Sequence, residues 1–290
     1  MHSTKRNAWG HRTREPPRRG GLRGHLEHGL HLTGTSLKIL ARDPQLLVFP
    51  FLALVLTGFV WLLVFVSLWA LGFPPWSPSS GFLYQEMFVA YLITYFLSVY
   101  FMTAIIGATQ ARLRGERADV LEGVRAANRL LPSLVVWSLV AATVGGLLRL
   151  ASLRWEGASR AIARVLGYTW PIATVFVVPA MVVEDVGPRK AFRHSRSLLR
   201  DVWGTRQTGV LGTGVVFAVL FLAGFAPFFW GVIDPAAVGW AVGAVLYWLL
   251  LGALWSVVHG ILVTALYHYA TASEASFGFS WQALNHPWVR

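Results

Sequence analysis

Residues 46–72 read LLVFPFLALVLTGFVWLLVFVSLWALG, a stretch without a single charged side chain. A transmembrane helix needs about 20 consecutive apolar residues, so this stretch is long enough to cross a bilayer. Comparable apolar runs follow at 83–108, 132–152, 163–183, 209–231 and 238–268. Hydrophobic residues make up 55% of the 290-residue chain and charged residues only 13%, with a mean hydropathy of +0.54, a balance foreign to soluble domains. We therefore predict an all-α transmembrane fold, a bundle of six membrane-spanning helices.

The segments outside the apolar runs predict a simple domain organisation. Residues 1–20 carry six Lys or Arg among Pro and Gly, which predicts a disordered basic tail. Residues 21–270 form the expected transmembrane domain, and 271–290 a cytoplasmic C-terminal tail. The first apolar run starts after 45 mostly polar residues and lacks a small-residue cleavage site, so we expect it to stay as an anchor. The chain has no cysteine, which excludes disulfides and thiolate metal sites.

Basic residues alternate between the loops and predict the orientation. With six crossings, 21 of the 25 Lys and Arg fall in the N-terminal segment, the second and fourth loops and the C-terminal tail. The remaining four lie on the other side: Arg149, Arg154, Arg160 and Arg164. Because cytoplasmic loops carry the excess of positive charge, we expect a multi-pass protein of the cytoplasmic membrane with both termini in the cytoplasm.

The inner segments also carry amphipathic patterns. Leucines recur at helical spacing over 22–40, with basic side chains on the opposite face, which predicts a helix on the membrane surface. Asp43 and Pro44 then predict an N-cap and first turn for the first span. Asp119, with Glu122 three residues on, resembles a capping box for a short second helix.

A third surface helix is expected to begin at Pro188 and stop at Gly204. The chain then divides into three units, each a surface helix followed by a transmembrane hairpin: 22–108, 119–183 and 188–268. The alternative is that any six-span protein has cytoplasmic loops that are basic and helical.

Three stretches carry a family resemblance: SLKILARDPQLLVFPFLA (36–53), VVPAMVVEDVGPRKAFRHSRSLLRDVWG (177–204) and ALYHYAT (265–271). Together they resemble an uncharacterised prokaryotic family of integral membrane proteins, a domain of unknown function, over about 25–270. The plan is remotely similar to the membrane domains fused to some bacterial glycerophosphodiester phosphodiesterases. The resemblance implies a membrane fold and carries over no functional residues, because those membrane domains are not the catalytic ones.

The helix from Pro188 presents a cationic stripe that is the best candidate surface for anionic lipid or phosphate. The stripe and its neighbouring lysine comprise Arg189, Lys190, Arg193, Arg196 and Arg200. Each such cation near an anionic leaflet contributes about 1 kcal/mol. The alternative is that the charges only orient the chain. Glu184 and Asp185 precede the stripe across a Gly-Pro turn, where they predict a salt bridge to Arg189 rather than a substrate or cation site.

His259 is the one titratable residue deep in an apolar run, and intramembrane ionisable groups are functional candidates. It shares the last span with Ser256, and a polar stripe on the second span is the expected partner: Tyr91, Thr94, Tyr95 and Ser98. These groups predict either hydrogen-bonded contacts between helices or a hydrated path. Gly239 and Gly243 form a GxxxG pattern that predicts close helix contact.

Other chemistries find little support. His25, His28 and His31 lack the acidic or thiol ligands that would complete a metal site, so no metal or cofactor is expected. The net charge of +12 is explained by the inner loops without nucleic acid. We expect a non-enzymatic scaffold, lipid-organising or partner-binding protein that contacts anionic lipids and a membrane-protein partner or second copy. The alternatives are a small transporter or channel around His259 and, third, an intramembrane enzyme.

Overall fold

The computed structural model describes residues 22–70, 81–115, 119–154, 161, 166–167, 169–171, 173–202 and 208–272. These residues form helices and turns, with no strand among them, which confirms the all-α prediction. The helices are α1 (Leu22–Arg42), η1 (Pro44–Leu47), α2 (Val48–Ala70), α3 (Gly81–Leu113), α4 (Val120–Arg129), α5 (Leu131–Arg154), α7 (Val177–Glu184), α8 (Pro188–Val202), α9 (Thr208–Ala223), α10 (Phe225–Ile233), η2 (Pro235–Ala237) and α11 (Val238–Ala272).

Five helical stretches in the described part of the chain are long and apolar enough to cross a membrane. They are Pro44–Ala70, Gln85–Arg112, Leu131–Leu148, Thr213–Ile233 and Val238–His268. Their lengths follow from near-continuous runs of Leu, Val, Phe and Ala. In lipid such runs are helical, because a helix satisfies its backbone hydrogen bonds internally. Five of the six expected spans are therefore helices of spanning length.

The expected span at 163–183 is the exception. Part of it lies outside the described residues, and the remainder is interrupted by a turn at Val175 and Phe176. The eight-residue helix α7 follows, about 12 Å long, which is much shorter than a bilayer core. The prediction of one continuous helix is wrong at this turn. Helix α7 is buried within the protein and does not present a long side to lipid.

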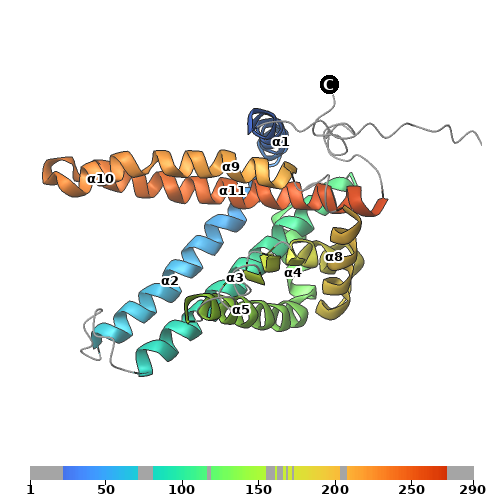
Figure 1. Ribbon diagram of the computed structural model, residues 1–290, viewed down its shortest axis with the longest axis horizontal. Coiled ribbons are helices and arrows are strands. Elements are labelled where there is room, and N and C mark those ends of the chain that lie inside the picture. The colour runs from blue at the N-terminus through green and yellow to red at the C-terminus, as the bar shows by residue number, and fades with distance from the viewer. Residues whose placement is uncertain are drawn as a thin grey trace, which may run out of the picture.

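The helices form two arms that diverge from a common end (Figure 1). One arm contains α9, α10 and α11, and the other contains α2 and α3, with α5 beside α3. The short helices α4 and α8 lie near the point where the arms meet. An ion pair of 3.3 Å between Asp43, at the start of α2, and Arg112, near the end of α3, ties helix ends together there. We call this end, where α2 begins and α3 and α11 end, the basic end.

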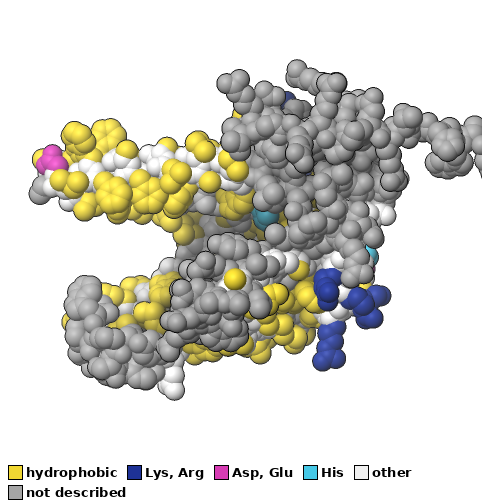
Figure 2. All heavy atoms as spheres, viewed as in Figure 1, with side chains coloured by type: hydrophobic (Ala, Val, Ile, Leu, Met, Phe, Trp, Pro, Cys, Tyr) yellow, Lys and Arg dark blue, Asp and Glu magenta, His cyan; other side chains and the backbone are white. Residues whose placement is uncertain are grey.

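Away from the basic end the arms are separated by an open hollow and carry mostly apolar surface (Figure 2). Phe51, Phe59 and Phe65 of α2 are 62%, 56% and 60% exposed, and Trp230 and Ile233 of α10 are 65% and 79% exposed. Apolar faces of this size are suited to lipid rather than water. The chain is therefore an integral membrane protein whose long helices present their sides to the bilayer.

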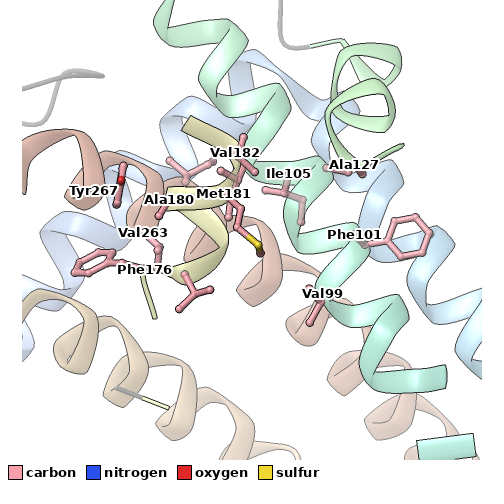
Figure 3. Close-up of a cluster of buried hydrophobic side chains, with 14 of the residues drawn as sticks. Val99, Phe101, Ile105, Ala127, Phe176, Ala180, Met181, Val182, Val263 and Tyr267 are labelled. Carbon is pink, nitrogen blue, oxygen red and sulfur yellow. The ribbon is translucent and has the colours of Figure 1, made fainter. Parts of the chain in front are cut away.

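The main core lies near the basic end and is centred on α7 (Figure 3). Phe176, Ala180 and Met181 are buried between Ile105 of α3 and Tyr267 of α11. Small side chains on α7 allow these helices to approach closely, while Phe176 and Met181 fill the remaining space. The same short helix leads directly into α8, so the core fixes where α8 begins.

The predicted helix starts are only partly as expected. Asp43 stands before Pro44 as predicted, but its side chain pairs with Arg112 instead of capping, and a 3₁₀ turn precedes α2. Asp119 does cap α4, accepting a hydrogen bond from the Leu121 amide. Glu122 pairs with Arg125 and leaves the capping box incomplete, because a cation one turn away is a stronger partner for its carboxylate.

Helix α4 docks on α3 through its smallest residues. A Cβ on Gly123 would lie 2.5 Å from the Ala104 carbonyl oxygen and from the Phe49 ring, and one on Gly107 would lie 2.5 Å from Ala126. This packing buries one side of α4 against protein and leaves Leu121 exposed. Val120 and Val124 of α4 are partly buried and pack against the main core.

The predicted GxxxG contact is wrong. Nothing lies within 4 Å of a Cβ built on Gly239 or Gly243. The close approach between α10 and α11 occurs instead at Gly231, where a Cβ would lie 2.3 Å from the Ala241 amide nitrogen. Spacing alone did not reveal which small residues face the neighbouring helix.

Candidate membrane-surface site on helix α8

Helix α8 carries its basic residues on the outside of the basic end. Arg189, Lys190, Arg193 and Arg196 are all exposed, and the side chain of Arg200 lies outside the described residues. Figure 1 shows α8 running crosswise to α11, and Figure 2 shows dark blue Lys and Arg side chains gathered over this region. Helix α8 therefore runs across the direction of α11, the longest candidate span, rather than along it.

The opposite face of α8 is buried in the protein. Ala191 and Ser195 have no exposed surface and Leu198 is 9% exposed. The Ser195 hydroxyl donates a hydrogen bond of 2.9 Å to the Ala173 carbonyl. The apolar face of α8 therefore packs on the protein. In this it differs from an amphipathic surface helix whose apolar face contacts acyl chains.

Three aromatic rings hold the middle of α8 against α5. Phe192 lies 6.2 Å from Trp137 of α5 and 5.8 Å from Trp170, and the two tryptophans stack at 6.3 Å. The Arg196 guanidinium lies 5.9 Å from the Phe192 ring centre, so the edge of this aromatic cluster also supports the cationic stripe. Trp170 is therefore partly buried in the contact between α5 and α8.

Glu184 is the centre of a second attachment. It accepts a hydrogen bond from the Tyr267 hydroxyl and pairs with His194 Nδ1 at 2.7 Å. Glu184 ends α7, His194 belongs to α8 and Tyr267 to α11, so one carboxylate joins three helices. We call these three residues the latch. The Tyr267 ring also packs on Phe176, 6.0 Å away, which keeps its hydroxyl directed at the carboxylate.

Asp185 makes the turn between α7 and α8. It adopts the left-handed conformation (φ 53°, ψ 46°), which Asp tolerates better than most residues. Its carboxylate lies 3.3 Å from Arg129 at the end of α4. Both side chains are more than half exposed, so this pair contributes little stability. The side-chain partners of Glu184 and Asp185 at the turn are thus His194 and Arg129, not Arg189 as the sequence suggested.

The intramembrane polar candidates are arranged differently. Ser98 donates to the Thr94 carbonyl within α3 at 2.9 Å, and the Tyr91 and Tyr95 rings lie 6.2 Å apart. His259 stacks on Trp255 at 5.2 Å. Ser256, like His259, is partly buried on α11.

The buried Nδ1 of His259 and the buried hydroxyl of Thr94 lack hydrogen-bond partners among the described atoms. No described hydrogen bond joins the α3 stripe to His259. Among the described residues, the polar side chains of α3 and those around His259 therefore form two separate groups that no hydrogen bond joins. No group of three or more His, Asp or Glu suited to a metal occurs among the described residues, and His25, His28 and His31 have side chains outside that set.

The latch was missed from the sequence. Neither His194 nor Tyr267 was a predicted site residue, and Tyr267 lies 83 positions from Glu184. No spacing signal links residues so far apart, because their contact depends on how α7 is buried.

Comparison with known proteins places these features within one family. No curated protein and no solved structure matches the chain. A model of a family of unknown function, DUF6159, matches residues 82–277, or 196 of the 290 residues. The match runs from α3 through α11 and includes α8 and all three latch residues. The chain therefore belongs to this family of unknown function.

Proposed function

We propose that this protein organises lipid at the inner surface of the cytoplasmic membrane, using α8 as a fixed cationic contact for anionic headgroups. The observation that carries the proposal is the division of α8 into two faces. One face is buried on the core, and the other presents Arg189, Lys190, Arg193 and Arg196 outward.

Rigid attachment distinguishes this surface from an ordinary basic loop. The latch, the aromatic cluster and the Ser195 hydrogen bond hold α8 at three points. A helix held in this way presents its cations in a fixed row, so several phosphates can be bound without ordering the helix at the moment of contact. Orientation of spans needs only the presence of charge in a loop, and does not require this attachment.

The proposal assigns the basic end to the cytoplasm, with both termini on that side. The cytoplasmic leaflet is rich in anionic lipid, and each cation near it gains about 1 kcal/mol. A scaffold of this kind would also suit a membrane-protein partner or a second copy beside the long helices. The similarity in plan to the non-catalytic membrane domains of glycerophosphodiester phosphodiesterases fits such a role. Transport through a polar interior at His259 is the competing proposal, supported by its buried, unpartnered Nδ1.

Native mass spectrometry of the purified protein tests the lipid contact. The test variant replaces the four arginines of the stripe with Gln: Arg189, Arg193, Arg196 and Arg200. The control replaces four arginines of the N-terminal segment: Arg6, Arg12, Arg14 and Arg18. Both variants lose the same net charge, so a difference between them reports position.

We expect the α8 variant to retain at least about tenfold less phosphatidylglycerol than the control, from about 1 kcal/mol per cation. Retention of phosphatidylcholine should be similar in both, because the contact is electrostatic. Equal retention of phosphatidylglycerol by the two variants would contradict the proposal and leave orientation as the role of the stripe.

A further inference from the structure

Helix α1 has three distinct faces, and the first docks on protein. Thr33, Ser36 and Leu40 are buried, at 7%, 0% and 5% exposure. The helix packs on α9 and α11, the arm that diverges from α2 and α3 away from the basic end. The sequence pattern predicted a leucine-rich face on the membrane surface, whereas Leu40 at the end of that stripe is buried against protein together with Thr33 and Ser36.

The second face consists of leucines that the docking leaves uncovered. Leu30 is 56% exposed and Leu37 is 39% exposed. They are seven residues apart, about two helical turns, so they project in nearly the same direction. That direction lies about a quarter-turn from the docking face.

The third face is basic. Lys38 and Arg42 are exposed and lie on the side of α1 roughly opposite the docking face. Around the axis of α1, the face that docks on protein is therefore followed by the apolar face and then by the cationic face. This order is the one expected at the boundary between acyl chains and headgroups, where leucines enter the apolar layer and the longer cations reach the phosphates.

The direction of α1 supports this boundary position. Figure 1 shows α1 nearly end-on while α11 runs across the view, so α1 lies crosswise to the longest span. Its last residue precedes the turn at Asp43 from which α2 enters the bilayer. A second copy of the chain is a poorer occupant for the leucine face, because a protein interface there would also cover Lys38 or Arg42, and charged residues are depleted in interface cores.

From these observations we propose that α1 is an interfacial anchor, with Leu30 and Leu37 inserted into the acyl layer and Lys38 and Arg42 on anionic headgroups. Through its contacts with α9 and α11, the anchor ties the separate arm to the surface of the leaflet. This inference does not depend on α8, since it rests on a different helix and on apolar insertion.

Depth-dependent quenching tests the anchor on the full-length protein. The chain has no cysteine, so Leu37→Cys and Lys38→Cys each give one thiol for an environment-sensitive label. Both side chains are exposed, so neither change disturbs the packing of α1. The labelled proteins are placed in vesicles of phosphatidylcholine and phosphatidylglycerol, with and without lipids brominated on the acyl chain.

We expect the label at position 37 to be quenched roughly twofold more than the label at 38, because an interfacial helix sinks its apolar face about 5–10 Å. Leu30→Cys and Arg42→Cys form a second pair with the same expected difference. Equal quenching at 37 and 38 would overturn the proposal. So would a label at 37 that is shielded but not quenched, which would indicate a second copy on this face. Neither outcome depends on lipid retention by α8.

Discussion

The latch shows how a single carboxylate determines the placement of α8. Glu184 is only 26% exposed and meets one neutral donor, Tyr267, and one imidazole, His194. A carboxylate in such a place needs its partners, since hydrogen bonds to charged groups each stabilise by about 1.5–3 kcal/mol. The sequence identified Glu184 as a turn residue, but its partners could not be predicted because they come from distant helices.

Removing the Tyr267 hydroxyl should therefore destabilise the protein. We expect Tyr267→Phe to lower the free energy of unfolding by about 1.5–3 kcal/mol, because Glu184 loses a donor while the ring packing is kept. Tyr91→Phe is the matched control, since Tyr91 is 39% exposed on the same class of helix. The measurement is the unfolding midpoint in detergent. A Tyr267→Phe midpoint equal to that of Tyr91→Phe would show that the latch does not bear on stability.

At the scale of elements, sequence patterns predicted where helices lie along the chain better than they predicted which residues make the contacts between helices. The starts of α4 and α8 were expected at Asp119 and Pro188 and are found there. The interior break before α7 was not expected, because residues 165–183 of that run carry no charged side chain. The residues through which α1 and α4 dock on protein were also not predicted, because small residues such as Ser36 and Gly123 make close contacts there. In a membrane, leucine suits lipid and protein equally, so hydrophobicity does not discriminate between them.

The α3–α4 contact gives a test at this scale. We expect Gly123→Ala to destabilise the protein by about 1–3 kcal/mol, because the added methyl group would meet the Ala104 backbone and the Phe49 ring. Gly146→Ala in α5 is the control, since nothing lies within 4 Å of its Cβ position. The two thermal unfolding midpoints should differ, with only the Gly123 variant lowered. If both variants unfold like the wild type, α4 does not pack on α3 as described.

At the scale of the molecule, composition predicted the membrane environment and the helical class. The divergence of the two arms was not predictable, because it depends on which apolar faces meet protein and which meet lipid. Three exposed tryptophans, Trp69, Trp230 and Trp240, lie near the ends of the long helices farthest from the basic end. Tryptophan favours the headgroup level of a bilayer, so these side chains fit an outer boundary opposite α1, α4 and α8.

The central claim is that the basic end, with α8, faces the cytoplasm. Single thiols at Ser79→Cys and Ser197→Cys test it in intact cells with a membrane-impermeant maleimide, since the chain has no other thiol. Ser79 follows the first span, and Ser197 is exposed on α8. We predict labelling of position 79 in intact cells and of position 197 only after the membrane is permeabilised. Labelling of position 197 in intact cells would contradict the account.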